Sequence, residues 1–151
     1  MSITNFSILA EAKNIEIGAE ISFYDELYFD LPKITQVINN LISNAIKFTM
    51  PGGKIIIKSF LIPDDFVEIH VLDDGIGISE TAQKKLFDYY RQDHVKGTSG
   101  ESGHGLGLAI CKNFIELHGG KIYLNSNPGK GSDFYFTLPL YPAADSMAEE
   151  N

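Results

Sequence analysis

Four polar side chains recur at helical spacing in the segment 36–49 and could together hold a phosphate and its metal ion. Gln36, Asn40, Asn44 and Lys47 stand at i, i+4, i+8 and i+11, which places them on one face of a helix. Asparagine amide oxygens can hold a hard, largely hydrated Mg²⁺, and a lysine could neutralise a phosphate oxygen. For this helix alone, a solvated polar face is the simpler interpretation, because asparagine gains nothing from a helix interior. A binding role therefore depends on the rest of the chain.

A second group, Asp73-Asp74-Gly75-Ile76-Gly77, directly follows an apolar run. Asp-Gly after a strand usually indicates a hairpin, but a capped helix pattern follows here instead of a strand. Two glycines at i and i+2 allow the backbone to approach a flat or polar ligand closely. The carboxylate of Asp73, at the end of a strand, could accept a hydrogen bond from an exocyclic amine. The segment is therefore a candidate pocket for a purine.

A third group, the glycine-rich run 103–108, opens a helical pattern. A bare glycine pattern is weak evidence and could be a flexible linker. It is not the dinucleotide-binding fingerprint, because it follows a loop rather than a strand. Its position nevertheless suits phosphates, since a helix N-terminus offers free amides and the positive end of the helix dipole. The preceding polar segment 92–102 predicts a mobile loop that could close over them as a lid.

The helix that carries the asparagines has clear boundaries. Asp30 fits an N-cap and Pro32 the first turn, while the sequence Met50-Pro51-Gly52-Gly53 ends the pattern. The apolar residues between these limits recur with helical spacing and predict one buried stripe: Ile34, Val37, Ile38, Leu41, Ile42 and Ala45.

The other patterns predict strands around this helix. Residues 14–23 alternate, so that Ile15, Ile17, Ala19 and Ile21 should face one way. Further strands are expected at 54–62, 66–72, 121–126 and 132–138, with hairpin turns at 63–65 and 127–131. Ser79 can cap a helix to about Tyr90 with Ala82 and Leu86 on its inner side, and the glycine run opens another helix to about Leu117. This order predicts an α/β two-layer sandwich, a mixed sheet of about five strands covered on one face by three helices.

Composition narrows the functional classes. The chain has 151 residues and a net charge of −8, which argues against a nucleic-acid surface because such surfaces are basic. Its one cysteine, Cys111, excludes an internal disulfide and a cysteine metal cage. No apolar run is long enough for a membrane helix, and no secretory signal is visible. We expect a cytoplasmic protein without membrane contact, or the cytoplasmic part of a membrane-bound sensor.

Taken in order, these groups resemble the catalytic and ATP-binding domain of two-component sensor histidine kinases, in the GHKL ATPase superfamily with its Bergerat fold. The resemblance runs from about residue 15 to 140. Residues 40–49 resemble the N box, residues 73–78 the G1 box, residues 86–92 the F box and residues 103–108 the G2 box. The ending Gly-x-Gly-Ser-x-Phe-x-Phe-x-Leu-Pro, at 129–139, also fits.

The resemblance implies ATP and Mg²⁺ as ligands and assigns roles to individual residues. Asp73 would bind the adenine amino group, Gly75 and Gly77 would make room for the base, and Ile78 would also belong to the nucleotide-binding site. Phe48 would stack near the base or pack in the core. Asn44 would be the Mg²⁺ ligand, with Asn40 beside the metal and phosphates and Lys47 at the phosphates. Arg91 is a candidate for steadying the transferred phosphate. The phosphates would be wrapped by the G2 residues Gly103, His104, Gly105, Leu106, Gly107 and Leu108.

The resemblance also implies a missing partner. Sensor kinases phosphorylate a histidine on a helical dimerisation domain, typically followed by an acidic residue, and none of the four histidines here is followed by Asp or Glu. We therefore expect residues 1–12 to be a linker remnant of a dimerisation domain, 13–140 the catalytic domain and 141–151 a flexible tail. The expected partners are the phosphoacceptor domain of the same or another kinase and, downstream, a response regulator.

Two other functions remain open at this stage. Related ATPases and serine kinases have a glutamate base where Asn40 stands, and an amide cannot take a proton. A GHKL ATPase or serine kinase is therefore disfavoured, while the imidazole of a histidine acceptor needs no base. A non-catalytic nucleotide-binding module is the third interpretation, and the loop 92–102 does not separate it from a kinase.

Overall fold

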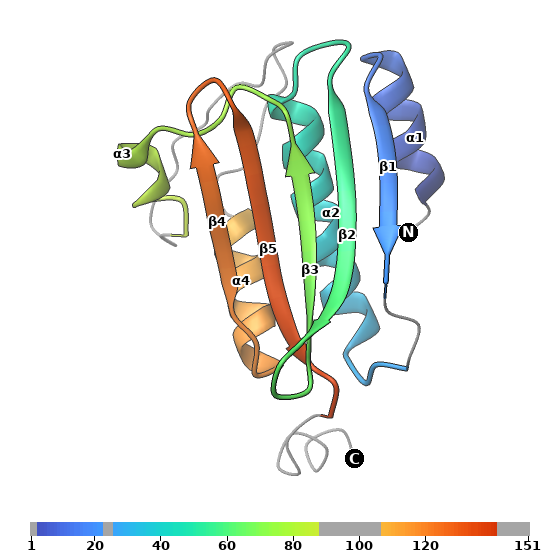
Figure 1. Ribbon diagram of the computed structural model, residues 1–151, viewed down its shortest axis with the longest axis vertical. Helices are drawn as coiled ribbons and strands as arrows, with labels where there is room; N and C mark the ends of the chain where they lie inside the picture. The colour runs from blue at the N-terminus through green and yellow to red at the C-terminus, as the bar shows by residue number, and fades with distance from the viewer. Residues whose placement is uncertain (1–2, 23–25, 88–106, 142–151) are drawn as a thin grey trace.

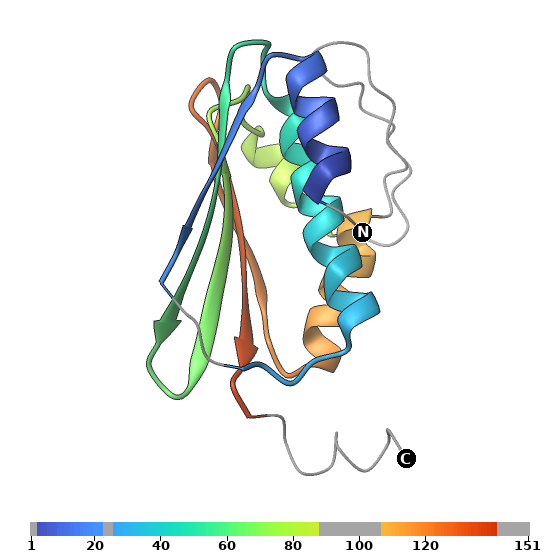
Figure 2. The ribbon, with the colours of Figure 1, turned by 90° about the vertical axis from the view of Figure 1, so that its right-hand side faces the viewer.

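The computed structural model describes residues 3–22, 26–87 and 107–141, which form a mixed sheet with helices on one face (Figures 1 and 2). In chain order the elements are α1 (Ile3–Ala12), β1 (Glu16–Ile21), α2 (Leu31–Phe48), β2 (Lys54–Ile62), β3 (Phe66–Asp73), α3 (Glu80–Gln83), α4 (Gly107–Leu117), β4 (Ile122–Asn127) and β5 (Gly131–Pro139). The five strands are ordered β1-β2-β3-β5-β4. The predicted α/β two-layer sandwich is confirmed.

The sheet combines one parallel pair with three antiparallel pairs. β1 runs parallel to β2, with Glu16 opposite Lys54, and the other neighbours are antiparallel. A parallel pair needs a crossover connection, and α2 supplies it between β1 and β2. The crossover lays α2 along the sheet, so that its C-terminal end lies at the same end of the molecule as the end of β3 (Figure 1).

Helix α2 begins and ends where the sequence predicts. The carboxylate of Asp30 accepts a hydrogen bond from the amide of Lys33 at 3.1 Å, and Pro32 lies in the first turn. The hydroxyl of Thr49, which is fully buried, donates to the Ala45 carbonyl at 2.6 Å as the helix ends. The buried residues of α2 are Ile34, Val37, Leu41, Ile42, Ala45 and Ile46.

The apolar core fills the space between the sheet and its helices. β3 and β5 contribute alternate residues such as Val67, Val71 and Phe136, and α4 contributes Ile115, all at most 1% exposed. From α1, Phe6 and Ala10 are buried in the same core. Figure 2 shows α1, α2 and α4 on one side of the sheet. No helix in the described part of the chain combines the length and the apolar character needed to cross a membrane.

The structure differs from the sequence prediction in two details. Helix α3 ends at Gln83, not near Tyr90, because the amides of Lys85 and Leu86 donate to carbonyls three residues back and tighten the chain into turns. This leaves Ala82 exposed, although Leu86 does pack against the core. In β1, Ile17 packs against the core as expected, but Ala19 and Ile21 are exposed further along this edge strand of the sheet.

Candidate functional site

The carboxylate of Asp73 lies on the helix-covered side of the sheet, at the end of β3. It continues the inward series of Val67, Ile69 and Val71 along the strand. One carboxylate oxygen accepts a hydrogen bond from the Gly75 amide at 2.9 Å. Burial raises the pKa of Asp73 from 3.8 to about 6, against the lowering effect of that hydrogen bond. The group is therefore a largely desolvated acceptor.

Gly75 joins the loop of residues 73–78, called the Asp73 loop below, to the end of α2. A Cβ on Gly75 would lie 2.3 Å from the Phe48 carbonyl oxygen and 2.8 Å from the Asp73 carboxylate, so only glycine fits between them. The next residue, Ile76, donates its amide to the same Phe48 carbonyl at 3.1 Å. The Asp73 loop, the candidate binding segment for a purine base, is thereby fixed directly to the helix that carries the asparagines.

The far side of this loop is held by residues that sequence analysis did not single out. The Ser126 hydroxyl accepts a hydrogen bond from the Ile78 amide at 2.9 Å, and the side chain of Gln83 donates to the carbonyls of Ile78 and Ser126 at 2.8 and 3.0 Å. Gly77, with φ of +72°, packs against the Asn127 carbonyl, where no side chain would fit. No local pattern signals the contacts with Ser126, since Ser126 is 48 residues after Ile78 and 43 residues after Gln83.

Asn40 lies where α2 meets the beginning of α4. Its amide nitrogen is 3.4 Å from the Gly107 carbonyl oxygen and 3.6 Å from the sulfur of Cys111, both on α4. Burial raises the pKa of the Cys111 thiol to about 11, so Cys111 is a neutral neighbour of Asn40. The structure thus brings together the asparagine helix and the last glycine of the run 103–108. The side chain of the next residue, Leu108, is buried in the core.

Asn44, Lys47 and Phe48 follow Asn40 along α2, and their side chains are half-buried. The ammonium nitrogen of Lys47 lies 4.9 Å from the centre of the Phe48 ring, in a cation–π contact. Phe48 is not among the described residues that form or pack against the apolar core. Its ring is therefore placed with the polar groups of α2 and not with the core.

The donor set at this site suits a metal ion that arrives with a phosphate ligand. Among the described residues no cluster of three or more His, Cys, Asp or Glu side chains could hold a metal by itself. The side-chain amide of Asn44 makes no hydrogen bond to another described residue, so its hard oxygen can serve as a ligand. One neutral protein oxygen is adequate for Mg²⁺ when phosphates and waters complete the octahedron.

Two hollows lie in the described surface, and the smaller one is lined in part by Asp73 and Ser126. One, of about 330 Å³, lies beside Glu11, Asn14 and Gly52, and another, of about 170 Å³, lies where the ends of β3, β4 and β5 meet. Neither is lined by the asparagines of α2. The better guide to the site is α2, because Gly75 and Ile76 join Asp73 to its C-terminal end and Asn40, two turns earlier on the same helix, lies against Gly107.

Several residues proposed from the sequence lie outside the described residues. They are Arg91, the loop 92–102, and Gly103, His104, Gly105 and Leu106 of the glycine run. For these positions the roles implied by the resemblance stay predictions.

Comparison with known proteins gives one consistent family. Residues 29–142 match the family model described as "Histidine kinase-, DNA gyrase B-, and HSP90-like ATPase". The adaptive-response sensory kinase SasA of Crocosphaera subtropica is 42% identical over 115 residues, which are 76% of this chain and 30% of that protein. SasA of Prochlorococcus marinus strain MIT 9303 is 37% identical over 131 residues, 85% of this chain and 35% of that protein. The chain spans about a third of the length of these relatives.

Solved structures agree with the sequence relatives. The catalytic domain of histidine kinase ThkA superposes with a TM-score of 0.78 at 33% identity, covering 92% of this chain and 89% of that domain. ThkA has also been solved with the response regulator protein TrrA, with a TM-score of 0.74 at 31% identity over 93% of this chain and 39% of that one. Full-length ShkA, in complex with AMPPNP, has a TM-score of 0.78 at 28% identity and covers 95% of this chain and 29% of ShkA.

Proposed function

The chain belongs to the family of histidine kinase-, DNA gyrase B- and HSP90-like ATPases, and from this premise we propose that it binds Mg²⁺-ATP and transfers the γ-phosphate to a histidine on a separate phosphoacceptor domain. It has the fold of a histidine kinase catalytic domain.

The observation that carries the proposal is the buried carboxylate of Asp73 beside a glycine that admits no side chain. A desolvated carboxylate favours a ligand with hydrogen-bond donors, and the adenine amino group is such a donor. Gly75 holds one carboxylate oxygen through its amide and keeps the loop against α2. Guanine presents a carbonyl at the corresponding position, which would place two acceptors face to face.

The asparagine face of α2 supplies the groups for the phosphates. Asn44 would contribute its amide oxygen to Mg²⁺, and Lys47 would place a positive charge at the phosphate oxygens. Asn40 lies beside Gly107 at the beginning of α4, where helix amides attract phosphate. When bound, Mg²⁺ would neutralise the charge of the transferred phosphoryl group. The chain itself would bind the base and align the γ-phosphate for in-line attack.

The identity of Asn40 supports transfer to histidine over hydrolysis. Activation of water or a serine hydroxyl requires a group that accepts a proton, and an amide cannot do so. A neutral imidazole has a lone pair and attacks without such help. The SasA and ThkA proteins are named as kinases, and ThkA has been solved with a response regulator. We extend these roles to this chain and propose a response regulator as the next phosphate acceptor.

Calorimetric titration tests the nucleotide specificity. Mg²⁺-ATP and Mg²⁺-ADP should bind, whereas Mg²⁺-GTP, which carries the same phosphates and charge, should bind at least about tenfold more weakly because Asp73 would face a carbonyl. Equal binding of GTP would contradict the role of Asp73. Absence of binding by all three nucleotides to the folded chain would contradict the proposed function.

A further inference from the structure

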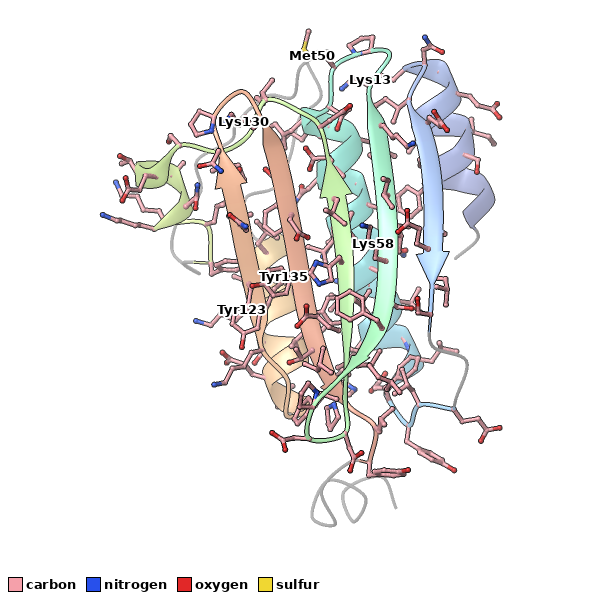
Figure 3. The ribbon with its side chains drawn as sticks, in the orientation of Figure 1. Lys13, Met50, Lys58, Tyr123, Lys130 and Tyr135 are labelled. Carbon is pink, nitrogen blue, oxygen red and sulfur yellow. The ribbon has the colours of Figure 1, made fainter. Side chains whose placement is uncertain are left out.

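The side chain of Lys13 extends from the turn after α1 to the C-terminal end of α2. Its ammonium nitrogen donates to the Ile46 carbonyl at 2.8 Å and to the Lys47 carbonyl at 3.1 Å. Lys13 stands in the turn between α1 and β1, more than thirty residues before these partners. Figure 3 shows it at the same end of the molecule as Met50, which follows α2. The contact therefore joins the first helix of the chain to the helix of the asparagines.

The two carbonyls that Lys13 binds belong to a group of three at the end of α2. The last four carbonyls of a helix have no partner within it, and the helix dipole makes a cation favourable there. Lys13 takes the carbonyls of residues 46 and 47, and the third, that of Phe48, accepts the amide of Ile76 at 3.1 Å. The Asp73 loop and Lys13 thus hold adjacent peptide groups of the same helical turn.

The turn that carries Lys13 is itself attached to the turn after α2. The Gly52 amide donates to the Asn14 carbonyl at 3.0 Å, and the Glu16 amide donates to the Gly53 carbonyl at 3.0 Å. Upstream, Phe6 and Ala10 of α1 are buried in the core. Lys13 is therefore held in place by α1, which precedes it, and by the hydrogen bonds of the residues that follow it. A displacement of α1 would move its ammonium group.

We propose that Lys13 is a positioning residue for nucleotide binding, which couples the position of α1 to the end of α2. The proposal rests on the proposed function. Lys13 fixes the peptide groups of residues 46 and 47. The peptide group of Phe48 follows directly and sets the place of Ile76 and Gly75 beside the Asp73 carboxylate. Because coupling between two sites is reciprocal, bound nucleotide should also restrain α1 and its turn.

Removal of Lys13 would have different effects if its role were purely structural. If Lys13 only stabilised the fold, its removal would lower the melting temperature equally with and without nucleotide. The Asp73 loop of the folded molecules would then be unchanged. A positioning role requires a change in the folded state itself, at the Ile76 amide and in the nucleotide affinity.

The direct test compares Lys13→Met with two reference variants. Lys13→Arg keeps a charged donor, and Lys58→Met removes a lysine that pairs with Glu20 at 3.5 Å on the sheet, away from α2. We expect Lys13→Met to raise the dissociation constant of Mg²⁺-ADP by about fivefold or more, the lower range of coupling between sites. The ¹⁵N–¹H resonance of Ile76 should shift. Lys58→Met should change neither quantity, and Lys13→Arg should retain most of the wild-type affinity for Mg²⁺-ADP.

A second measurement uses the wild-type chain and does not depend on the folding of a variant. Hydrogen exchange of the amides in residues 9–16 should slow when Mg²⁺-ADP binds. Wild-type binding with unchanged exchange in this segment would overturn the inference, as would a folded Lys13→Met that retains the wild-type affinity and Ile76 resonance. Failure of the wild-type chain to bind any adenine nucleotide would instead contradict the proposed function, so the two failures are distinguishable.

Discussion

Replacing Asp73 by Asn should make the nucleotide-free domain more stable while it weakens nucleotide binding. Burial raises the pKa of Asp73 from 3.8 to about 6, so ionising this group costs the folded state free energy. Each pKa unit corresponds to about 1.4 kcal/mol, which gives about 3 kcal/mol at pH 7.5. Partial contact with solvent reduces this to about 1–2 kcal/mol. An asparagine side chain keeps the oxygen that accepts the hydrogen bond from the Gly75 amide, but it carries no charge to desolvate.

The pH dependence of stability gives the sign of this effect. Between pH 3.8 and about 6 the folded chain holds a proton on Asp73 that the unfolded chain has released. The stability that this bound proton gives the folded state is therefore fully present below pH 3.8 and is lost as the pH rises through about 6. Nucleotide affinity should change in the opposite direction, rising with pH through the same range, because the adenine amine requires the ionised carboxylate.

Two assays on the same samples test this reasoning. Thermal unfolding at pH 7.5 should show a melting temperature about 3–6 °C higher for Asp73→Asn than for wild type. The difference should shrink at pH 4.5, where the wild-type carboxyl is mostly protonated when folded. Calorimetry should show Mg²⁺-ADP binding weakened about 10- to 100-fold, the value of a charged hydrogen bond. A less stable variant with normal affinity would refute the reasoning, and Asp74→Asn is the neighbouring control.

Three further substitutions test other parts of the site. Asn44→Ala should remove most of the Mg²⁺ dependence of ATP affinity, measured by titration with and without the metal, while leaving the melting temperature within about 2 °C; an unchanged metal dependence would contradict its role as ligand. Gly75→Ala should cost about 2 kcal/mol or more in denaturant unfolding, because its Cβ would lie 2.3 Å from the Phe48 carbonyl oxygen; a neutral effect would contradict the close packing. Ser126→Ala leaves the Ile78 amide without its acceptor and should cost about 1–3 kcal/mol by the same assay, together with faster exchange of that amide; protection equal to wild type would show that the hydroxyl is dispensable.

The helix of the asparagines is the part of the fold that sequence predicts best. A capping aspartate, a first-turn proline and a terminal Pro-Gly-Gly sequence act locally, and the structure follows them from Asp30 to Thr49. The hairpin strands are also predicted closely, because their turns contain the residues that tight turns require. In contrast, the exposure of Ile21 depends on its place in an edge strand, and α3 ends early in tight turns that its sequence does not announce.

The site shows the same division between local and distant information. Residue types identify Asp73, Gly75 and Asn40, and the structure places Asp73 with Gly75 at the end of β3 and Asn40 against Gly107. The contacts that hold them come from elsewhere in the chain. Lys13 and Ser126 stand in ordinary surroundings in the sequence, and their roles depend on carbonyls and amides that only folding brings near.

Phosphoryl transfer to a separate phosphoacceptor domain tests the central claim most directly. The chain should be incubated with Mg²⁺ and γ-labelled ATP together with the purified dimerisation and phosphoacceptor domain of a homologous kinase, with Asp73→Asn as the matched control. The account predicts label on the acceptor domain that is lost in acid and kept in base, as expected of phosphohistidine, and that depends on Asp73. Nucleotide binding without any label on the acceptor, or label that resists acid as phosphoserine does, would contradict it.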